Sequence, residues 1–245
     1  MNEPSRNRPY QAPLLLSVMA IFVVSSGCQM LAGGQNIQGV RDFKAGQQIA
    51  AEGRFRTSIK TNPQNADAHY NLAVTLHRRG IQNKDQQSLA EAEEMYHRCI
   101  DLNGDHIECH RELTVLLAQT GRSNQSFKLL KNWATRSPES PDARVELARL
   151  YEEFGDADTA EIHLHEALNR QSTHPRAHAA LARLNERAGK LEAAAANYQQ
   201  AYRQNRDPKI IDRLARLRNY SGARLASDGN DASLSTASGG WIRRY

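Results

Sequence analysis

A spacing of 34 residues recurs along this chain and limits what it can fold into. Each repeat carries an apolar helical face, then a glycine, then a second apolar helical face. The positions that keep the spacing are Gly121, Gly155 and Gly189; Leu113, Leu147 and Leu181; Tyr96, Leu130, Leu164 and Tyr198; and Ala92, Ser126, Ala160 and Ala194. The pattern predicts a row of helix hairpins, because one hairpin cannot bury both of its faces and needs a neighbour.

The spacing changes once, after Gly80. Gly46 and Gly80 are 34 residues apart, whereas Phe55 and Tyr96 are 41 apart, so seven extra residues follow Gly80. We expect them in the polar run IQNKDQQ, residues 81–87, as an insertion in a hairpin turn. Such an insertion leaves the packed faces of the hairpin intact.

The composition favours an all-α fold. Apolar residues make up 40% of the chain and aromatic residues only 6%. Alanine is abundant, which favours helices packed through small side chains over a sheet of branched ones. The 32 basic and 27 acidic residues alternate along the helical segments, as on solvated helix surfaces. Positive charge is not gathered on a stripe with a recognition motif, so nucleic acid is not expected as a partner.

The repeated positions resemble the tetratricopeptide repeat. In residues 141–174 they are Leu147, Ala148, Tyr151, Gly155, Ala160, Leu164 and Ala167, and in the next repeat Leu181, Ala182, Gly189, Ala194, Tyr198 and Ala201. The sequence departs from the tetratricopeptide pattern at two positions. Trp133 stands where a small residue is usual, and Gly104 replaces the closing proline. The resemblance implies an all-α solenoid of about four to five helix hairpins with a C-terminal capping helix.

The repeat pattern also predicts where the parts of the chain begin and end. A solenoid over residues 41–220 is expected, and Ser/Gly/Asp-rich residues 221–245 are predicted to be disordered. Before Gly46 only Gly39 fits the pattern, so a leading helix for the first hairpin has little support. The expected repeats lie near 41–65, 66–106, 107–140, 141–174 and 175–208, followed by a cap at 209–220.

The first 27 residues have the layout of an export signal. Arg6 and Arg8 precede an apolar run at residues 14–24, and small residues then lead to Cys28. Eleven helical residues rise about 16 Å, well short of the roughly 30 Å hydrocarbon core of a bilayer. A removable signal peptide at 1–27 is therefore preferred over a permanent membrane span.

The residues SSGC that end at Cys28 resemble the lipobox of bacterial lipoproteins. Ser25 stands where leucine is most often found. The resemblance implies acyl chains such as palmitate on Cys28, a lipidated linker at 28–40 and attachment to a cell membrane. Gln29 follows the cysteine in place of aspartate, which implies the periplasmic side of the outer membrane if the cell has two membranes. The alternative is an ordinary signal peptide, with Cys28 left as a free thiol or removed.

Several cysteines and histidines lie close together in the middle of the chain: His97, Cys99, His106, Cys109 and His110. No Cys-x-x-Cys pair exists, and His97 and Cys99 point to nearly opposite sides of a helix, so no metal site is predicted. A disulfide between Cys99 and Cys109 fits an oxidising compartment, because the two residues lie on consecutive packed helices. Two buried reduced thiols are the alternative that the sequence favours.

No arrangement of residues predicts catalysis. His69, His110 and His178 share one repeat position, with Arg144 in the remaining repeat. Equivalent positions point in parallel from different helices and do not converge on one ion, so we predict partly exposed histidines at repeat interfaces. Adjacent carboxylates face different directions, and neither a phosphate-binding loop nor a Ser/His/Asp arrangement occurs. Catalytic residues, cofactors and small-molecule substrates are not expected.

The first helices of stacked hairpins line the inner face of a solenoid. Its mixed charge and small apolar patches suit a peptide or an extended segment of a partner protein. The Lys/Asn pair with which related domains bind chaperone C-termini is missing. A row of arginines suggests an acidic segment, and the alternative is that they are solvated. The predicted groove residues are Tyr70, Val74, His77, Arg111, Val115, Arg149 and Arg183, of which the three arginines form the row.

Two functions are consistent with these features. The first is a non-enzymatic, membrane-anchored scaffold that binds a partner protein during assembly of an envelope complex. Its layout is similar to that of tetratricopeptide lipoproteins that help pilus or secretion pores assemble. The second is an accessory or regulatory subunit that docks a cell-envelope enzyme.

Overall fold

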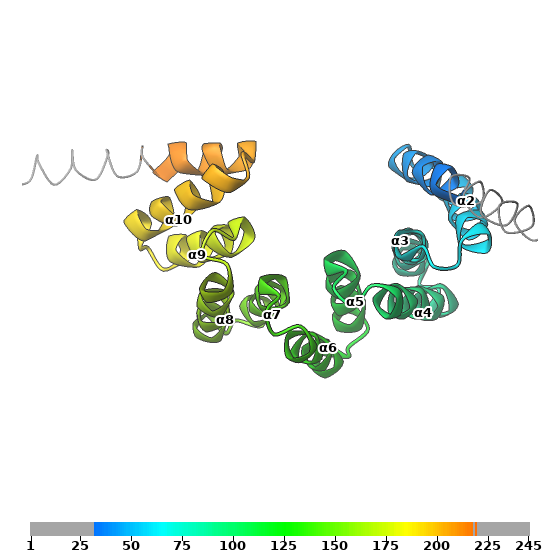
Figure 1. The fold of residues 1–245 in the computed structure, drawn as a ribbon, viewed down its shortest axis with the longest axis horizontal. Coiled ribbons are helices and arrows are strands. Elements are labelled where there is room, and N and C mark those ends of the chain that lie inside the picture. Colours follow the sequence, from blue (N-terminus) through cyan, green and yellow to red (C-terminus); the bar gives the residue numbers. More distant parts are fainter. Residues whose placement is uncertain (1–31, 218, 220–245) are drawn as a thin grey trace, which may run out of the picture. The chain divides into compact units, whose positions relative to one another are not determined.

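The computed structural model describes residues 32–217 and residue 219, and the regular structure of this part is helical throughout (Figure 1). The predicted all-α fold is confirmed. The predicted signal peptide, Cys28 and the tail at 221–245 lie outside the described residues. The helices are residues 32–44, α2 (Gln48–Thr61), α3 (Ala66–Asn83), α4 (Gln86–Leu102), α5 (Ile107–Gln119), α6 (Ser123–Arg136), α7 (Pro141–Glu153), α8 (Ala157–Arg170), α9 (Pro175–Arg187), α10 (Leu191–Gln204) and residues 208–217.

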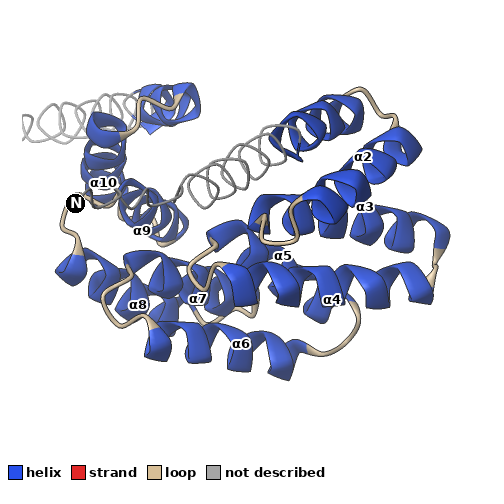
Figure 2. Ribbon diagram, turned by 45° about the vertical axis from the view of Figure 1, so that its right-hand side comes forward, coloured by secondary structure: helices blue, strands red, loops and turns tan. Residues whose placement is uncertain are grey.

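The chain forms two compact units, of which the first ends at Ser126 and the second begins at Phe127. In the first unit α3 packs against α2 and α4, and α4 packs against α5. In the second unit α7, α8, α9 and α10 pack in the same consecutive order (Figure 2). In addition α3 contacts α5, and α7 contacts α9, so the first helices of successive hairpins are neighbours. Each unit is therefore a stack of hairpins, as the repeat predicts.

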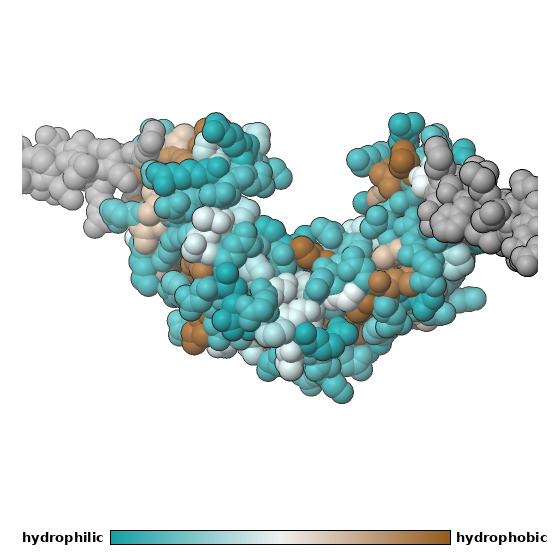
Figure 3. All heavy atoms as spheres, in the orientation of Figure 1, coloured by the Kyte–Doolittle hydropathy of each residue, from teal (hydrophilic) through white to brown (hydrophobic). Residues whose placement is uncertain are grey.

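Small and large side chains alternate in the cores at the repeated positions. Ala92, Ala160 and Ala194 are fully buried, and they let the paired helices approach closely. Tyr96 and Leu164, from the neighbouring column, fill the space beside them. The surface is by contrast mostly hydrophilic on the face drawn in Figure 3, where apolar side chains occur only in small groups.

Glycines in the left-handed region end most of the first helices. Gly121, Gly155 and Gly189 have φ angles of 77°, 83° and 72°, which any other residue adopts only with strain. Gly80 is different, because α3 continues through it to Asn83 and Lys84 takes the left-handed conformation instead, with φ 54°.

The seven extra residues therefore do not form a long turn, and the prediction that they do is wrong. Helix α3 has 18 residues and α4 has 17, whereas the corresponding α7 and α8 have 13 and 14. The whole insertion thus lengthens the two helices of one hairpin. Inside α3, Gly80 permits a close contact, because a Cβ atom there would lie 2.6 Å from Cδ2 of Leu89 on α4.

The helix at residues 32–44 supplies the leading helix of the first hairpin. It overlaps the segment 28–40 that the sequence predicts as a linker, and for the described residues 32–40 that prediction is wrong. Ala32 is fully buried, and its carbonyl accepts a hydrogen bond from Ser58 Oγ at 2.8 Å. The ring of Phe55 packs so closely on Gly39 that a Cβ atom would lie 2.6 Å from it.

A helix at residues 208–217 follows the last hairpin, where the sequence predicts a cap over 209–220. Its Ile210 and Leu217 are buried in one cluster with Tyr198 and Ala201 of α10. The helix thus covers the apolar face that α10 would otherwise expose.

The shared histidine position ties each inter-hairpin turn to the following helix. The side chain in this position hydrogen-bonds the carbonyl six residues earlier: His69 Nε2 to Pro63 O at 3.0 Å, His110 Nε2 to Gly104 O at 2.9 Å, Arg144 Nη1 to Pro138 O at 2.7 Å and His178 Nε2 to Ser172 O at 2.9 Å. The predicted partial exposure is wrong for His69 and His110, which are 5% and 0% exposed, because they reach inward to the turn.

Candidate functional site: a groove between α3 and α5

Helices α3 and α5 border an open groove of about 460 Å³ in the first unit. We call it the α3/α5 groove. Four of the residues predicted to face a partner line it, because they lie on the side of their helices away from the packed Leu-Ala positions. The lining consists of Tyr70, Val74, His77, Arg78, Ile81 and Gln82 from α3, and Glu112, Val115 and Gln119 from α5.

The lengthened end of α3 contributes part of this lining. Ile81 and Gln82 lie beyond Gly80, where the sequence predicts the helix to end, so sequence reasoning missed them as groove residues. The seven-residue insertion was the signal that could have revealed them. Ile81 is 44% exposed and places an apolar side chain at the groove. Arg78 is held nearby by stacking on the ring of Phe43, 4.5 Å from its centroid.

Hydrogen bonds and ring contacts fix the walls of the groove. His77 Nε2 lies 2.9 Å from Gln119 Oε1, which joins α3 to α5, and His77 Nδ1 lies 3.4 Å from the hydroxyl of Tyr96 on α4. The ring of Tyr70 lies 5.2 Å from that of His106 and 6.4 Å from that of Tyr96. The groove is therefore largely pre-formed.

The two tyrosines keep their protons at neutral pH. Burial, followed by the negative charges of Glu112 and Glu108, raises the pKa of Tyr70 to about 12. Burial is also the main cause that raises the pKa of Tyr96 far above its usual value. Both hydroxyls therefore remain hydrogen-bond donors, and neither is poised as a base.

The lining suits binding more than chemistry. Val74, Ile81 and Val115 are apolar, whereas Arg78 and Glu112 carry opposite charges. Apolar side chains beside a few polar groups can hold an extended peptide, with the polar groups fixing its register. No residue of this lining set is a serine, cysteine or threonine that could act as a nucleophile next to a base.

The predicted row of arginines is divided between the two units, and the row itself stays a prediction. Arg111 belongs to α5 of the first unit and is absent from the groove lining, whereas Arg149 and Arg183 line a cavity of about 430 Å³ in the second unit. Arg183 lies 3.4 Å from Glu152, and Arg149 lies 3.0 Å from the fully buried Glu146. An acidic ligand would therefore have to compete with carboxylates already in place.

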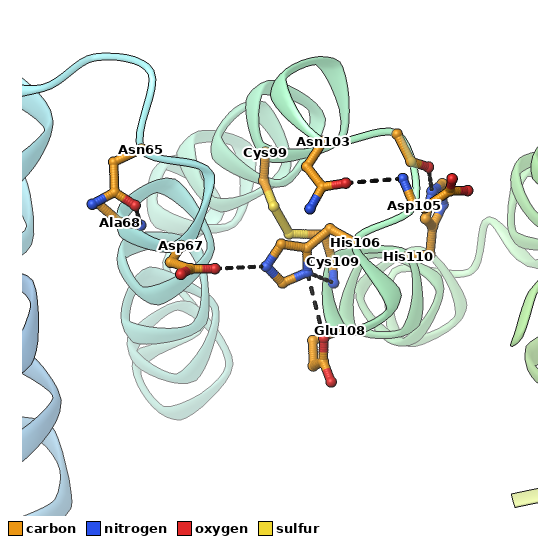
Figure 4. The surroundings of a disulfide bond; sticks show 11 residues. Asn65, Asp67, Ala68, Cys99, Asn103, Asp105, His106, Glu108, Cys109 and His110 are labelled. Carbon is orange, nitrogen blue, oxygen red and sulfur yellow. Dashed lines mark hydrogen bonds and ion pairs between the residues drawn. A yellow bond between two sulfur atoms is a disulfide. The ribbon is translucent and has the colours of Figure 1, made fainter.

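A disulfide joins Cys99 on α4 to Cys109 on α5, with their Cα atoms 6.5 Å apart (Figure 4). Of the two alternatives for these cysteines, this structure contains the bonded one. The bond links the two hairpins whose first helices form the α3/α5 groove. His97 is exposed and lies apart from the buried Cys99, as the helical spacing predicts.

Two family models for the tetratricopeptide repeat match the chain, at residues 55–92 and 124–184. The chain contains tetratricopeptide repeats. Neither match indicates a catalytic family. A comparison with curated proteins gave no match.

Solved structures with tetratricopeptide-like folds are similar to this chain. A thermophilic tetratricopeptide repeat protein of Thermus thermophilus is 24% identical with a TM-score of 0.56, over 76% of this chain and 98% of its own. The Pseudomonas aeruginosa protein pilF is 16% identical with a TM-score of 0.53, over 88% of this chain and 95% of its own. A human IFIT1 dimer with m7Gppp-AAAA is 17% identical with a TM-score of 0.52, over 76% of this chain and 45% of its own. These likenesses establish the fold, and the absence of a nucleic-acid partner stays a prediction.

Proposed function

We propose that this chain is a non-enzymatic scaffold whose α3/α5 groove binds an extended segment of a partner protein. Tetratricopeptide folds bind proteins or peptides, which gives the class of partner. The observation that carries the proposal is the groove lining, in which apolar Val74, Ile81 and Val115 lie beside hydrogen-bonding side chains. An extended segment can place one side chain among these apolar residues and pair its backbone with Gln82 or Gln119.

We further propose that the scaffold is anchored to a membrane through lipid on Cys28. The SSGC sequence and the apolar run at 14–24 support it. No helix of the described residues is both long and apolar enough to cross a bilayer. In a cell with two membranes the lipid would lie on the periplasmic side of the outer membrane.

The proposed role is assembly of an envelope complex of the pilus or secretion type. Its support is the combination of a lipoprotein-like N-terminus with tetratricopeptide repeats, together with the similarity of fold to P. aeruginosa pilF. The proposal predicts that a loss of groove binding impairs assembly, while the scaffold itself stays folded and anchored.

Site-specific photo-crosslinking in the source cells tests the groove. A photoreactive residue at Val115 is expected to capture one partner, whereas one at Glu94, exposed on α4, captures none above background. Val74→Arg introduces a charge into the apolar lining, and we expect it to abolish capture while the helical circular dichroism signal is unchanged. Equal capture from both positions would contradict the groove as the binding surface.

Metabolic labelling tests the anchor independently. Labelled palmitate is expected in the wild-type chain and to be absent from Cys28→Ala, which should leave the membrane fraction. An unlabelled wild-type chain would overturn the anchor and leave the groove proposal standing.

A further inference from the structure

Three buried side chains beside the groove bring metal-ligating atoms together: Cys99, His106 and Cys109. One ligand atom from each lies within 4.8 Å of the others. Cys99 comes from the last turn of α4, His106 is the N-cap of α5, and Cys109 is in the first turn of α5. Figure 4 shows the His106 ring beside the disulfide, with one nitrogen directed to Asp67. Residues from two helices thus meet at one buried point.

The hydrogen bonds of His106 define which of its nitrogens carries the proton. Nδ1 lies 3.2 Å from the backbone N–H of Cys109, which can only donate, and Nε2 lies 3.2 Å from the Asp67 carboxylate, which accepts when ionised. The lone pair of Nδ1 therefore accepts the N–H of Cys109, and Nε2 holds the proton. This is the arrangement of metal-binding histidines, in which a carboxylate holds the second N–H and orients the ring.

We propose that Cys99, Cys109 and His106 Nδ1 bind a Zn²⁺ ion when the disulfide is reduced. A dithiol reductant supplies two electrons and two protons, which convert the S–S bond into two thiols while the reductant becomes a disulfide. Zn²⁺ then binds both thiolates and releases the two protons. Two thiolates and an imidazole are ligands that zinc prefers, and water completes the tetrahedron.

The distance between the Cα atoms of Cys99 and Cys109 is compatible with a disulfide and with two thiolates on one zinc ion. Two thiolates on one zinc ion, each about 2.3 Å from the metal, lie less than about 4.6 Å apart. With Cα atoms 6.5 Å apart, the two sulfurs reach such positions by rotation of their side chains. The Cys109 N–H loses Nδ1 as its acceptor when the metal takes that lone pair, so zinc replaces one bond of the helix cap.

The second unit contains the same histidine without the cysteines. His174 is the N-cap of α9, its Nδ1 accepts from Ala177 N at 3.2 Å, and its Nε2 lies 3.2 Å from Asp142. By the repeat spacing, the buried Ala167 and Ala177 stand where Cys99 and Cys109 stand in the first unit. The histidine and its carboxylate are thus a shared feature of the fold, and the two cysteines are what make a metal site.

Cobalt binding followed by absorption spectroscopy tests the proposal. The full-length chain with Cys28→Ser keeps Cys99 and Cys109 as its only thiols, because the sequence has three cysteines. This protein is reduced with dithiothreitol, freed of the reductant under nitrogen and titrated with Co²⁺. We expect one equivalent to give thiolate charge-transfer and tetrahedral visible bands, and Zn²⁺ to abolish them. The oxidised protein should give neither band.

Matched variants separate a metal site from a simple dithiol. His106→Asn keeps an N-cap acceptor but removes the imidazole, and it should weaken binding about tenfold or more. Asp67→Asn should weaken it about tenfold through the ring orientation. His174→Asn makes the same change in the second unit and should leave cobalt binding unchanged. Absence of tetrahedral bands from the reduced protein, or equal affinity in His106→Asn, would overturn the proposal.

Discussion

At the residue scale, Glu146 is a fully buried carboxylate on α7 that holds two arginines. Arg149 lies 3.0 Å away, and Arg176 of α9 pairs with the other carboxylate oxygen. Glu146→Ala removes the carboxylate and so breaks both ion pairs at once. We expect the free energy of unfolding to fall by about 2 to 3 kcal/mol, somewhat less than for a fully buried pair because the arginine side chains reach solvent.

Urea unfolding followed by circular dichroism measures this change, and Glu153 provides the control. Glu153 also pairs with Arg149, but its side chain is 52% exposed. Glu153→Ala should therefore cost less than about 1 kcal/mol. Equal effects of the two substitutions would show that burial of the Glu146 carboxylate does not matter.

His69 gives the first unit a dependence on pH. Burial is the largest cause that lowers its pKa, opposed by the bond to the Pro63 carbonyl, with Arg98 lowering it further. Its Nδ1 is buried without a hydrogen-bond partner, so a proton there would be poorly accommodated. The unfolded chain therefore takes up the proton first, and the stability contributed by neutral His69 falls as pH drops through about 6.5.

Urea unfolding at pH 7.5 and 5.5 tests this prediction. His69→Gln removes the titrating group, so the loss of stability between these pH values should be smaller in the variant than in the wild type. A larger loss in the variant would show that protonation of His69 stabilises the fold.

The sequence predicted which histidines occupy equivalent positions, but not the direction in which their side chains point. The spacing showed that His69, His110 and His178 are equivalent. Such a side chain can face solvent or the turn that precedes its helix. The choice depends on whether a carbonyl group of that turn is available to accept a hydrogen bond, and the helical pattern of apolar residues does not contain this information. The same limit applies to His106, whose ring contacts Asp67, 39 residues earlier.

At the element scale, two helical glycines differ in what surrounds them. A Cβ atom at Gly80 of α3 would collide with Leu89, whereas one at Gly53 of α2 would meet nothing within 4 Å. Gly53→Ala should therefore stabilise the fold by about 0.5 to 1 kcal/mol through helix propensity. Gly80→Ala should destabilise it by about 1 to 3 kcal/mol through overpacking. Thermal unfolding of both variants checks the opposite signs, and stabilisation by Gly80→Ala would contradict the close contact of α3 with α4.

The elements were predictable where the 34-residue spacing is regular. The hairpins from α5 to α10 follow directly, because their small residues and left-handed glycines repeat. The boundaries near Gly80 were not predictable, because a glycine can end a helix or permit a close contact, and only the packing of Leu89 distinguishes the two. The helix at 32–44 was missed because it packs on Phe55 through Gly39 and not through the repeated pattern.

At the scale of the whole molecule, the disulfide belongs to one of two compact units. Reduction should lower the stability of the first unit by about 2 to 3 kcal/mol, as estimated for a closed loop of about ten residues. Hydrogen exchange after reduction, in the absence of metal, should become faster in α3, α4 and α5, while α8 to α10 keep their protection. Equal acceleration in both units would mean that they unfold together.

The lengthened α3 changes the lining of the groove without changing the stack of hairpins. A chain without the seven extra residues would still stack its hairpins, since none of the repeated core positions lies among them. It would nevertheless lose Ile81 and Gln82 from the lining of the α3/α5 groove. The repeated positions thus hold the stack together, and the inserted residues add two side chains to the groove that we propose as the binding surface.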